Sequence, residues 1–133
     1  MGRREQHPLA LSTDIERNAT RTVAVANALM ARAMGAGIHF DSNPKTGSPV
    51  SSGWRPPAVN AATKGAATNS KHMTGLAVDV YDPAGKIDAW LLSERGQQAL
   101  VDLGVWIEDP GATAGWSHWQ IVPPGSGRRV FHP

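Results

Sequence analysis

Residues 76–81 (LAVDVY) form the most strand-like segment of this 133-residue chain. Side chains alternate between the two faces of a strand. One face would carry Leu76, Val78 and Val80, and the other would carry Ala77, Asp79 and Tyr81. Three aliphatic side chains mark the first face as the one that packs on a core. The fold must therefore bury one face of this strand and leave Asp79 on the opposite face.

A long amphipathic helix is predicted near the N-terminus. Thr13 and Glu16 match a capping box, and Gly35 and Gly37 can end the helix. Apolar residues recur at helical spacing between these signals, at Ile15, Ala19, Val23, Ala26, Met30 and Ala33. The apolar run 23–38 is interrupted by polar residues and is too short to span a bilayer, so a core-facing helix explains it better than a targeting segment.

The remaining elements are short. We predict strands at 37–40, 50–52, 105–107 and 116–122, helical turns at 58–62, and a helix at 87–103 that is broken near Ser93. The prolines, glycines and arginines after residue 122 predict a poorly ordered tail. The expected fold is a small α+β domain, an antiparallel sheet with flanking helices, in one unit (residues 1–133) with a core at about 13–122 and tails at both ends.

Composition excludes several classes of site. The chain has no cysteine, so a metal would have to be held by His, Asp or Glu. The net charge is +2, without a long basic run containing aromatic residues, so nucleic acid is not an expected partner. Arg3, Arg4, Arg128 and Arg129 lie near the termini, where we expect solvated side chains.

Two histidines and one aspartate form a candidate metal site. Gly75 allows the chain to turn between His72 and the strand that carries Asp79. In the last strand Trp116 and His118 share a face, so His118 could join the other two if the strands are neighbours. Such a ligand set is usual for catalytic zinc. The alternative remains open that Asp79 forms a salt bridge and that the histidines are packed in the core.

Three segments together resemble a known family. They are S-G-W-R-P at 52–56, S-K-H-M-T-G-L-A-V-D at 70–79 and W-S-H at 116–118. This order is similar to that of the zinc D-alanyl-D-alanine carboxypeptidases and the related phage L-alanyl-D-glutamate endolysins, a group that shares its fold with the hedgehog signalling domain. The resemblance covers roughly residues 13–122 and implies a hedgehog/DD-peptidase-like fold.

The resemblance implies roles for individual residues. His72, Asp79 and His118 would bind Zn²⁺. Arg55 would bind a substrate carboxylate, with a structural salt bridge as the alternative. Ser70 matches the motif serine and would support the site by hydrogen bonding.

The general base is the point at which the chain departs from the family. Many members have a glutamate three residues before the last histidine, and Gly115 occupies that position here. Glu108 is the predicted base and Asp109 the next candidate. A surface carboxylate at the end of a strand is the alternative for Glu108.

Other histidines and tryptophans have less specific predictions. His39 is expected to pack in the core or at an edge, with a role in the site as the alternative. His7 and His132 are expected to be solvent-exposed. The tryptophans Trp54, Trp116 and Trp119 could line a peptide groove or belong to the core.

The resemblance implies a zinc peptidase that acts on the peptide stems of bacterial peptidoglycan. Of the tryptophans, Trp116 is the one predicted to contact the substrate. The alternative is a zinc-binding module of a phage or cell-wall assembly without catalysis, which Gly115 supports. We expect a monomer that is made in the cytoplasm without a signal peptide, does not bind membranes, and acts on the cell wall or in the periplasm. Whether the enzyme is a carboxypeptidase or an endopeptidase depends on loops such as 41–49 and 108–115.

Overall fold

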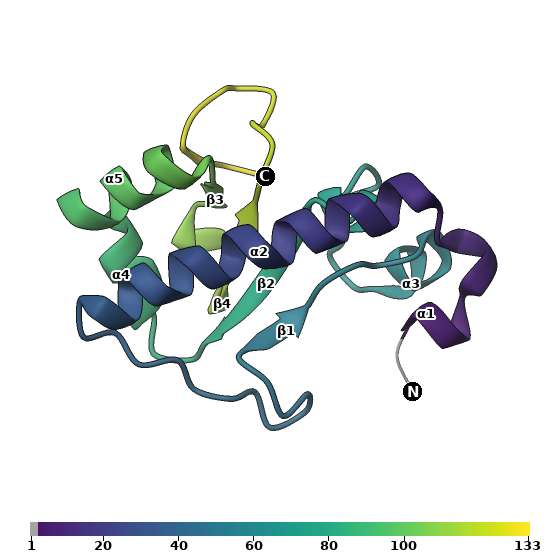
Figure 1. Ribbon diagram of the computed structural model, residues 1–133, viewed down its shortest axis with the longest axis horizontal. Coiled ribbons are helices and arrows are strands. Elements are labelled where there is room, and N and C mark those ends of the chain that lie inside the picture. Colours follow the sequence, from purple (N-terminus) through teal and green to yellow (C-terminus); the bar gives the residue numbers. More distant parts are fainter. Residues whose placement is uncertain (1–2) are drawn as a thin grey trace.

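The computed structural model describes residues 3–133 and shows a five-stranded sheet with helices packed against it (Figure 1). The strands lie in the order β1-β2-β4-β3-β5, with bounds Val50–Ser52 (β1), Ala77–Asp82 (β2), Trp106–Glu108 (β3), Gly115–Gln120 (β4) and Val130–Phe131 (β5). The α-helices are Arg3–Gln6 (α1), Thr13–Gly35 (α2), Pro57–Ala62 (α3), Lys86–Leu92 (α4) and Glu94–Leu103 (α5). The 3-10 helices are Pro8–Ala10 (η1), Lys71–Thr74 (η2) and Pro110–Ala112 (η3). The α+β class is as predicted.

The two central strands place the predicted site residues side by side. β2 and β4 are antiparallel, and their register pairs Asp79 with His118 and Tyr81 with Trp116. Val78 and Val80 are buried on the opposite face of β2, which confirms the alternation predicted for this strand. β1 is antiparallel to β2 and β3 is antiparallel to β4, whereas β5 runs parallel to β3.

The core lies between one face of the sheet and the helices α2, α4 and α5. α2 crosses this face in front of β2 (Figure 1), and Leu29 of α2, Leu91 of α4 and Leu100 of α5 are fully buried. The break predicted near Ser93 is the junction between α4 and α5, where the Ser93 hydroxyl accepts a hydrogen bond from the Gly96 amide at 3.2 Å. The apolar run 23–38 is mostly part of α2, as expected for a core-facing helix.

The start of α2 differs from the prediction by one residue. Ser12 is the N-cap, and its hydroxyl accepts from the Ile15 amide at 3.1 Å. Thr13 is already the first helical residue, so the predicted capping box of Thr13 and Glu16 is wrong. The buried face consists of Thr22, Ala26, Leu29 and Ala33, and the predicted face residue Val23 is 52% exposed.

Residues 37–40 are not a strand, contrary to the prediction. Ile38 and Phe40 pack against the core instead, and the Phe40 ring lies edge-on to Trp119 with 6.4 Å between centroids. β1 takes the edge position beside β2 that this segment would have needed. The expectation that His39 is packed was also wrong, because its side chain is 84% exposed and lies 3.2 Å from the Asp41 carboxylate.

The C-terminal segment is ordered by pairing, and the predicted poorly ordered tail is a further correction. The Asp109 amide donates to the Phe131 carbonyl at 2.7 Å, which fastens β5 to the end of β3. Arg129 lies over the Trp106 ring at 4.3 Å and donates to the Val105 carbonyl at 3.1 Å. Arg3 also departs from the expected solvated state, because it donates to the Trp54 carbonyl at 2.6 Å.

Among residues 3–133, no helix combines the length and the apolar character needed to cross a bilayer.

Candidate metal centre

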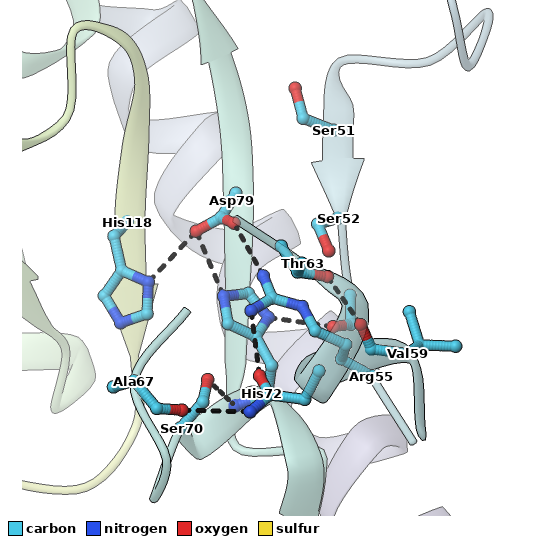
Figure 2. Close-up of polar contacts among 12 residues, drawn as sticks. Ser51, Ser52, Arg55, Val59, Thr63, Ala67, Ser70, His72, Asp79 and His118 are labelled. Atoms are coloured by element: carbon cyan, nitrogen blue, oxygen red, sulfur yellow. Dashed lines mark hydrogen bonds and ion pairs between the residues drawn. The ribbon is translucent and has the colours of Figure 1, made fainter. Parts of the chain in front are cut away.

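Three side chains converge on the face of the sheet opposite the core (Figure 2). His72 comes from η2, Asp79 from β2 and His118 from β4. Asp79 Oδ1 lies 3.1 Å from His72 Nε2 and 3.0 Å from His118 Nδ1. One donor atom from each residue lies within 4.8 Å of the others, so the three could hold one metal ion.

The ring nitrogen of His72 that faces away from Asp79, which we call the outer nitrogen, contacts a backbone carbonyl. His72 Nδ1 lies 2.8 Å from the Gly53 carbonyl oxygen. A carbonyl oxygen can only accept a hydrogen bond, so Nδ1 carries the proton. The lone pair of Nε2 then points toward Asp79.

The outer nitrogen of His118 is held by the side chain of Gln120. The Gln120 amide nitrogen donates to the Val122 carbonyl at 2.9 Å, which directs its oxygen toward His118. That oxygen lies 3.1 Å from His118 Nε2, so Nε2 is the donor. The lone pair of Nδ1 is then directed toward Asp79, as for His72.

This donor set fits a divalent cation. With both outer nitrogens protonated, two imidazole lone pairs and a carboxylate oxygen face one another, and all three are acceptors. A cation between them, either a proton or a metal ion, removes the repulsion. Neutral imidazoles and an ionised carboxylate are the forms that bind zinc.

Without a metal ion, a proton on an imidazole nitrogen that faces Asp79 takes the place of this cation. Burial alone would raise the pKa of Asp79, but the hydrogen bonds with His118 and His72 together outweigh burial and hold the pKa well below its usual range. Burial lowers the pKa of His118, and the hydrogen bond and charge of Asp79 outweigh it, so this pKa is raised. Asp79 therefore remains a carboxylate at neutral pH.

Arg55 supports the cluster from the side of Asp79. Its Nη2 lies 3.5 Å from Asp79 Oδ2, and its Nη1 donates to Asn60 Oδ1 at 3.1 Å. Arg55 is buried, and the Asn60 side chain is in turn fixed by the Ala67 carbonyl at 2.9 Å. These contacts match the structural salt bridge considered as the alternative, and binding of a substrate carboxylate by Arg55 stays a prediction.

Glu108 and Asp109 differ in their surroundings. Glu108 is half-buried and lines the same cavity as the cluster. Burial raises the pKa of Glu108, while the charges of His118 and His72 lower it and that of Asp79 raises it. The Asp109 carboxylate instead accepts from the Gly111 amide at 2.9 Å and caps η3. Of the two predicted bases, Glu108 is the one at the cavity.

The other predicted site residues also reach the cavity. Its volume is about 490 Å³, and Ser70 and Trp116 contribute to its lining. The Ser70 hydroxyl accepts from the His72 amide at 3.3 Å, which starts η2 in the correct place (Figure 2). Trp116 is 38% exposed, in contrast to Trp119, which is buried in the core. His132 is exposed as predicted, and it lines this cavity as well.

The sequence patterns did not predict the residues that hold the cluster and Arg55 in place, which are Gly53, Asn60 and Gln120. The alternation of β4 placed Gln120 on the same face as His118, which was a usable signal for a supporting role. The Gly53 carbonyl and the Asn60 side chain had no such signal, because their contacts depend on how the loop before α3 folds against η2.

A family model described as peptidase M15 matches residues 16–102, which is more than half of the chain. The matched range includes Arg55, His72 and Asp79 and ends before Glu108 and His118. No curated protein and no solved structure gives a significant match.

Proposed function

Because the chain belongs to the peptidase M15 family, whose members are zinc-dependent peptidases, we propose that it hydrolyses the peptide stems of bacterial peptidoglycan with Zn²⁺ held by His72, Asp79 and His118. The observation that carries the proposal is the convergence of these three side chains, with Glu108 in the same cavity. The resemblance of the three sequence segments to peptidoglycan peptidases supports this substrate. The proposed place of action is the cell wall or the periplasm, and the proposed active form is a monomer.

When bound, zinc supplies a Lewis acid that polarises the peptide carbonyl and increases the acidity of water. Asp79 contributes Oδ1 to the cluster, while Arg55 neutralises Oδ2 and keeps the carboxylate oriented. Gly53 and Gln120 keep each imidazole in the tautomer that a metal requires. The ligands are therefore oriented before any ion binds, which is the usual role of such supporting residues.

Glu108 is the proposed general base. Its carboxylate accepts a proton from the attacking water and then donates it to the leaving amine. A general base works best when its pKa lies near the working pH. The raised pKa that burial imposes on Glu108 is a shift in this direction.

Digestion of purified muropeptides, followed by mass spectrometry, tests the proposal. We expect zinc-loaded wild type to release stem fragments and Glu108→Gln to lose roughly 10²- to 10⁴-fold in kcat, the usual contribution of general acid–base catalysis. Zinc content should be unchanged in Glu108→Gln. Asp109→Asn is the matched control and should keep most of the activity.

The peptidase activity and the assignment of Glu108 as the base can each be contradicted separately. If wild type with bound zinc releases nothing from any stem, the non-catalytic zinc module becomes the better explanation. If Glu108→Gln keeps full activity while the zinc ligands are essential, the assignment of the base is wrong and the metal assignment stands.

A further inference from the structure

Two cavities meet at the cluster of His72, Asp79 and His118. The first, of about 490 Å³, contains His72, Glu108 and His118. The second, of about 430 Å³, is lined by Tyr81 and by parts of the loops 43–45 and 114–115. Asp79 and Trp116 line both cavities, so the cluster lies at their boundary and not at the end of either one.

The strand register explains why the two cavities follow one line. Asp79 is paired with His118 and Tyr81 with Trp116, which lie two residues later in β2 and two residues earlier in β4. Residues two apart lie on the same face of a strand. The two cavities are thus successive parts of a groove along β2 and β4. A peptide lying in this groove would have residues on both sides of the metal ligands.

We propose that the protein is an endopeptidase, which binds stem residues on both sides of the scissile bond. This inference rests on the proposed function. A carboxypeptidase needs a closed end with a cation that binds the terminal carboxylate beside the scissile bond. Arg55, the cation predicted for that role, lines the first cavity, but its guanidinium already contacts Asn60 and Asp79. The groove continues past the cluster toward Tyr81.

Exposed lysines line both parts of the groove. Lys64 and Lys71 line the first cavity and Lys45 lines the second. All three are exposed, and none forms an ion pair within residues 3–133. Unpaired cations in both cavities favour an acidic peptide as the ligand. This ligand class agrees with the acidic stems of peptidoglycan.

The decisive experiment compares three synthetic peptides with zinc-loaded wild type. They are the stem L-Ala-γ-D-Glu-L-Lys-D-Ala-D-Ala, the same stem with a C-terminal amide, and the dipeptide D-Ala-D-Ala. We expect cleavage of an internal bond, with the amide cleaved at a rate within about twofold of the free acid, and no cleavage of the dipeptide. Product masses identify the bond. Release of the C-terminal D-Ala alone, lost on amidation, would overturn the inference while leaving the peptidase function intact.

Variants in the second cavity test whether the groove extends past the cluster. Tyr81→Ala and Lys45→Met should each raise KM for the stem about fivefold with kcat little changed, the size of an ordinary interface contact. Lys86→Met, an exposed lysine at the start of α4, is the matched control and should leave KM unchanged. Unchanged KM in both cavity variants would overturn the inference.

A wild type that cleaves none of the peptides contradicts the proposed function but still permits a test of the groove. Binding of the amidated stem is then measured by calorimetry. Weaker binding by both Lys71→Met and Tyr81→Ala supports a groove that extends to both sides of the cluster. Equal binding by wild type and both variants overturns it.

Discussion

At the scale of single residues, Gln120 decides which nitrogen of His118 is available to a metal. Its amide is fixed at one end by the Val122 carbonyl and at the other by His118 Nε2. The residue is 3% exposed, so water cannot easily replace it. The proposed ligand His118 is therefore oriented by a neutral side chain two residues away on the same face of β4.

Replacing Gln120 with methionine should weaken zinc binding. Methionine has a similar length, but its thioether is only a weak hydrogen-bond acceptor for His118 Nε2. The imidazole is then free to adopt the other tautomer. Loss of such a supporting hydrogen bond typically costs 10- to 100-fold in metal affinity. Competition with a chromophoric chelator measures this change. Gln98→Met, on the exposed side of α5, is the control, and equal affinities for the two variants would contradict the role of Gln120.

At the scale of elements, α2 holds the turn that carries His72. The Thr22 hydroxyl donates to the Gly75 carbonyl at 2.7 Å, and the Asn18 amide donates to the Thr74 carbonyl at 3.0 Å. Gly75 has a φ of +74°, and a Cβ there would lie 2.8 Å from the Ile15 carbonyl oxygen. The close contact between η2 and α2 therefore requires glycine for two reasons.

Gly75→Ala should destabilise the protein more than Gly85→Ala. Both glycines have left-handed backbones, with φ of +74° and +69°, and each substitution incurs the strain of that region, of order 1–3 kcal/mol. Gly85 has open space around its Cα, whereas Gly75 also has the contact with α2. Urea unfolding gives the two changes in the free energy of unfolding. Equal values would show that the contact with α2 does not matter.

At the scale of the whole molecule, Asp88 lies where α4 packs against the sheet. It is a buried residue of α4, close to Thr113 and to Ser117 of β4. Burial raises the pKa of Asp88 to about 6, with the charges of Asp82 and Asp109 adding to the effect and the Ser117 and Thr113 hydroxyls opposing it. An acid whose pKa is raised by folding binds its proton more tightly in the folded state than in the unfolded state.

The stability of the protein should therefore have a pH-dependent component that Asp88→Asn removes. Between about pH 4 and pH 6 the folded state binds more protons at this residue, so its contribution to the free energy of unfolding falls as the pH rises. Because folding raises the pKa of Asp88 from 3.8 to about 6, we expect Asp88→Asn to be more stable than wild type at pH 7 by roughly 3 kcal/mol. This difference should become smaller toward pH 4. Urea unfolding across this range measures the difference. Glu94→Gln, an exposed residue at the start of α5, is the control, and a wild-type slope in Asp88→Asn would contradict the prediction.

Local patterns predicted the central part of the fold. The alternation of apolar residues in β2 gave the correct buried face, and helical spacing predicted α2 together with the break at Ser93. Prediction was poorer for segments whose structure depends on contacts with residues far away in the sequence. Residues 37–40 have strand-like composition but contribute to the core through Phe40, and the Pro- and Gly-rich segment before β5 gave no indication of pairing with β3.

The sequence by itself determined the chemistry that this protein has available. Without cysteine, any metal ligands must be histidines and carboxylates, and the spacing of His72, Gly75 and Asp79 depends on turn and strand geometry that is local to the chain. The tertiary structure decided the rest. Pairing of β2 with β4 brought His118 to Asp79, the Gly53 carbonyl and Gln120 selected the tautomers, and β3 placed Glu108 at the cavity while Asp109 became a cap. The physical reason is that strand order and loop packing bring together groups far apart in sequence, and their contacts leave no periodic pattern along the chain.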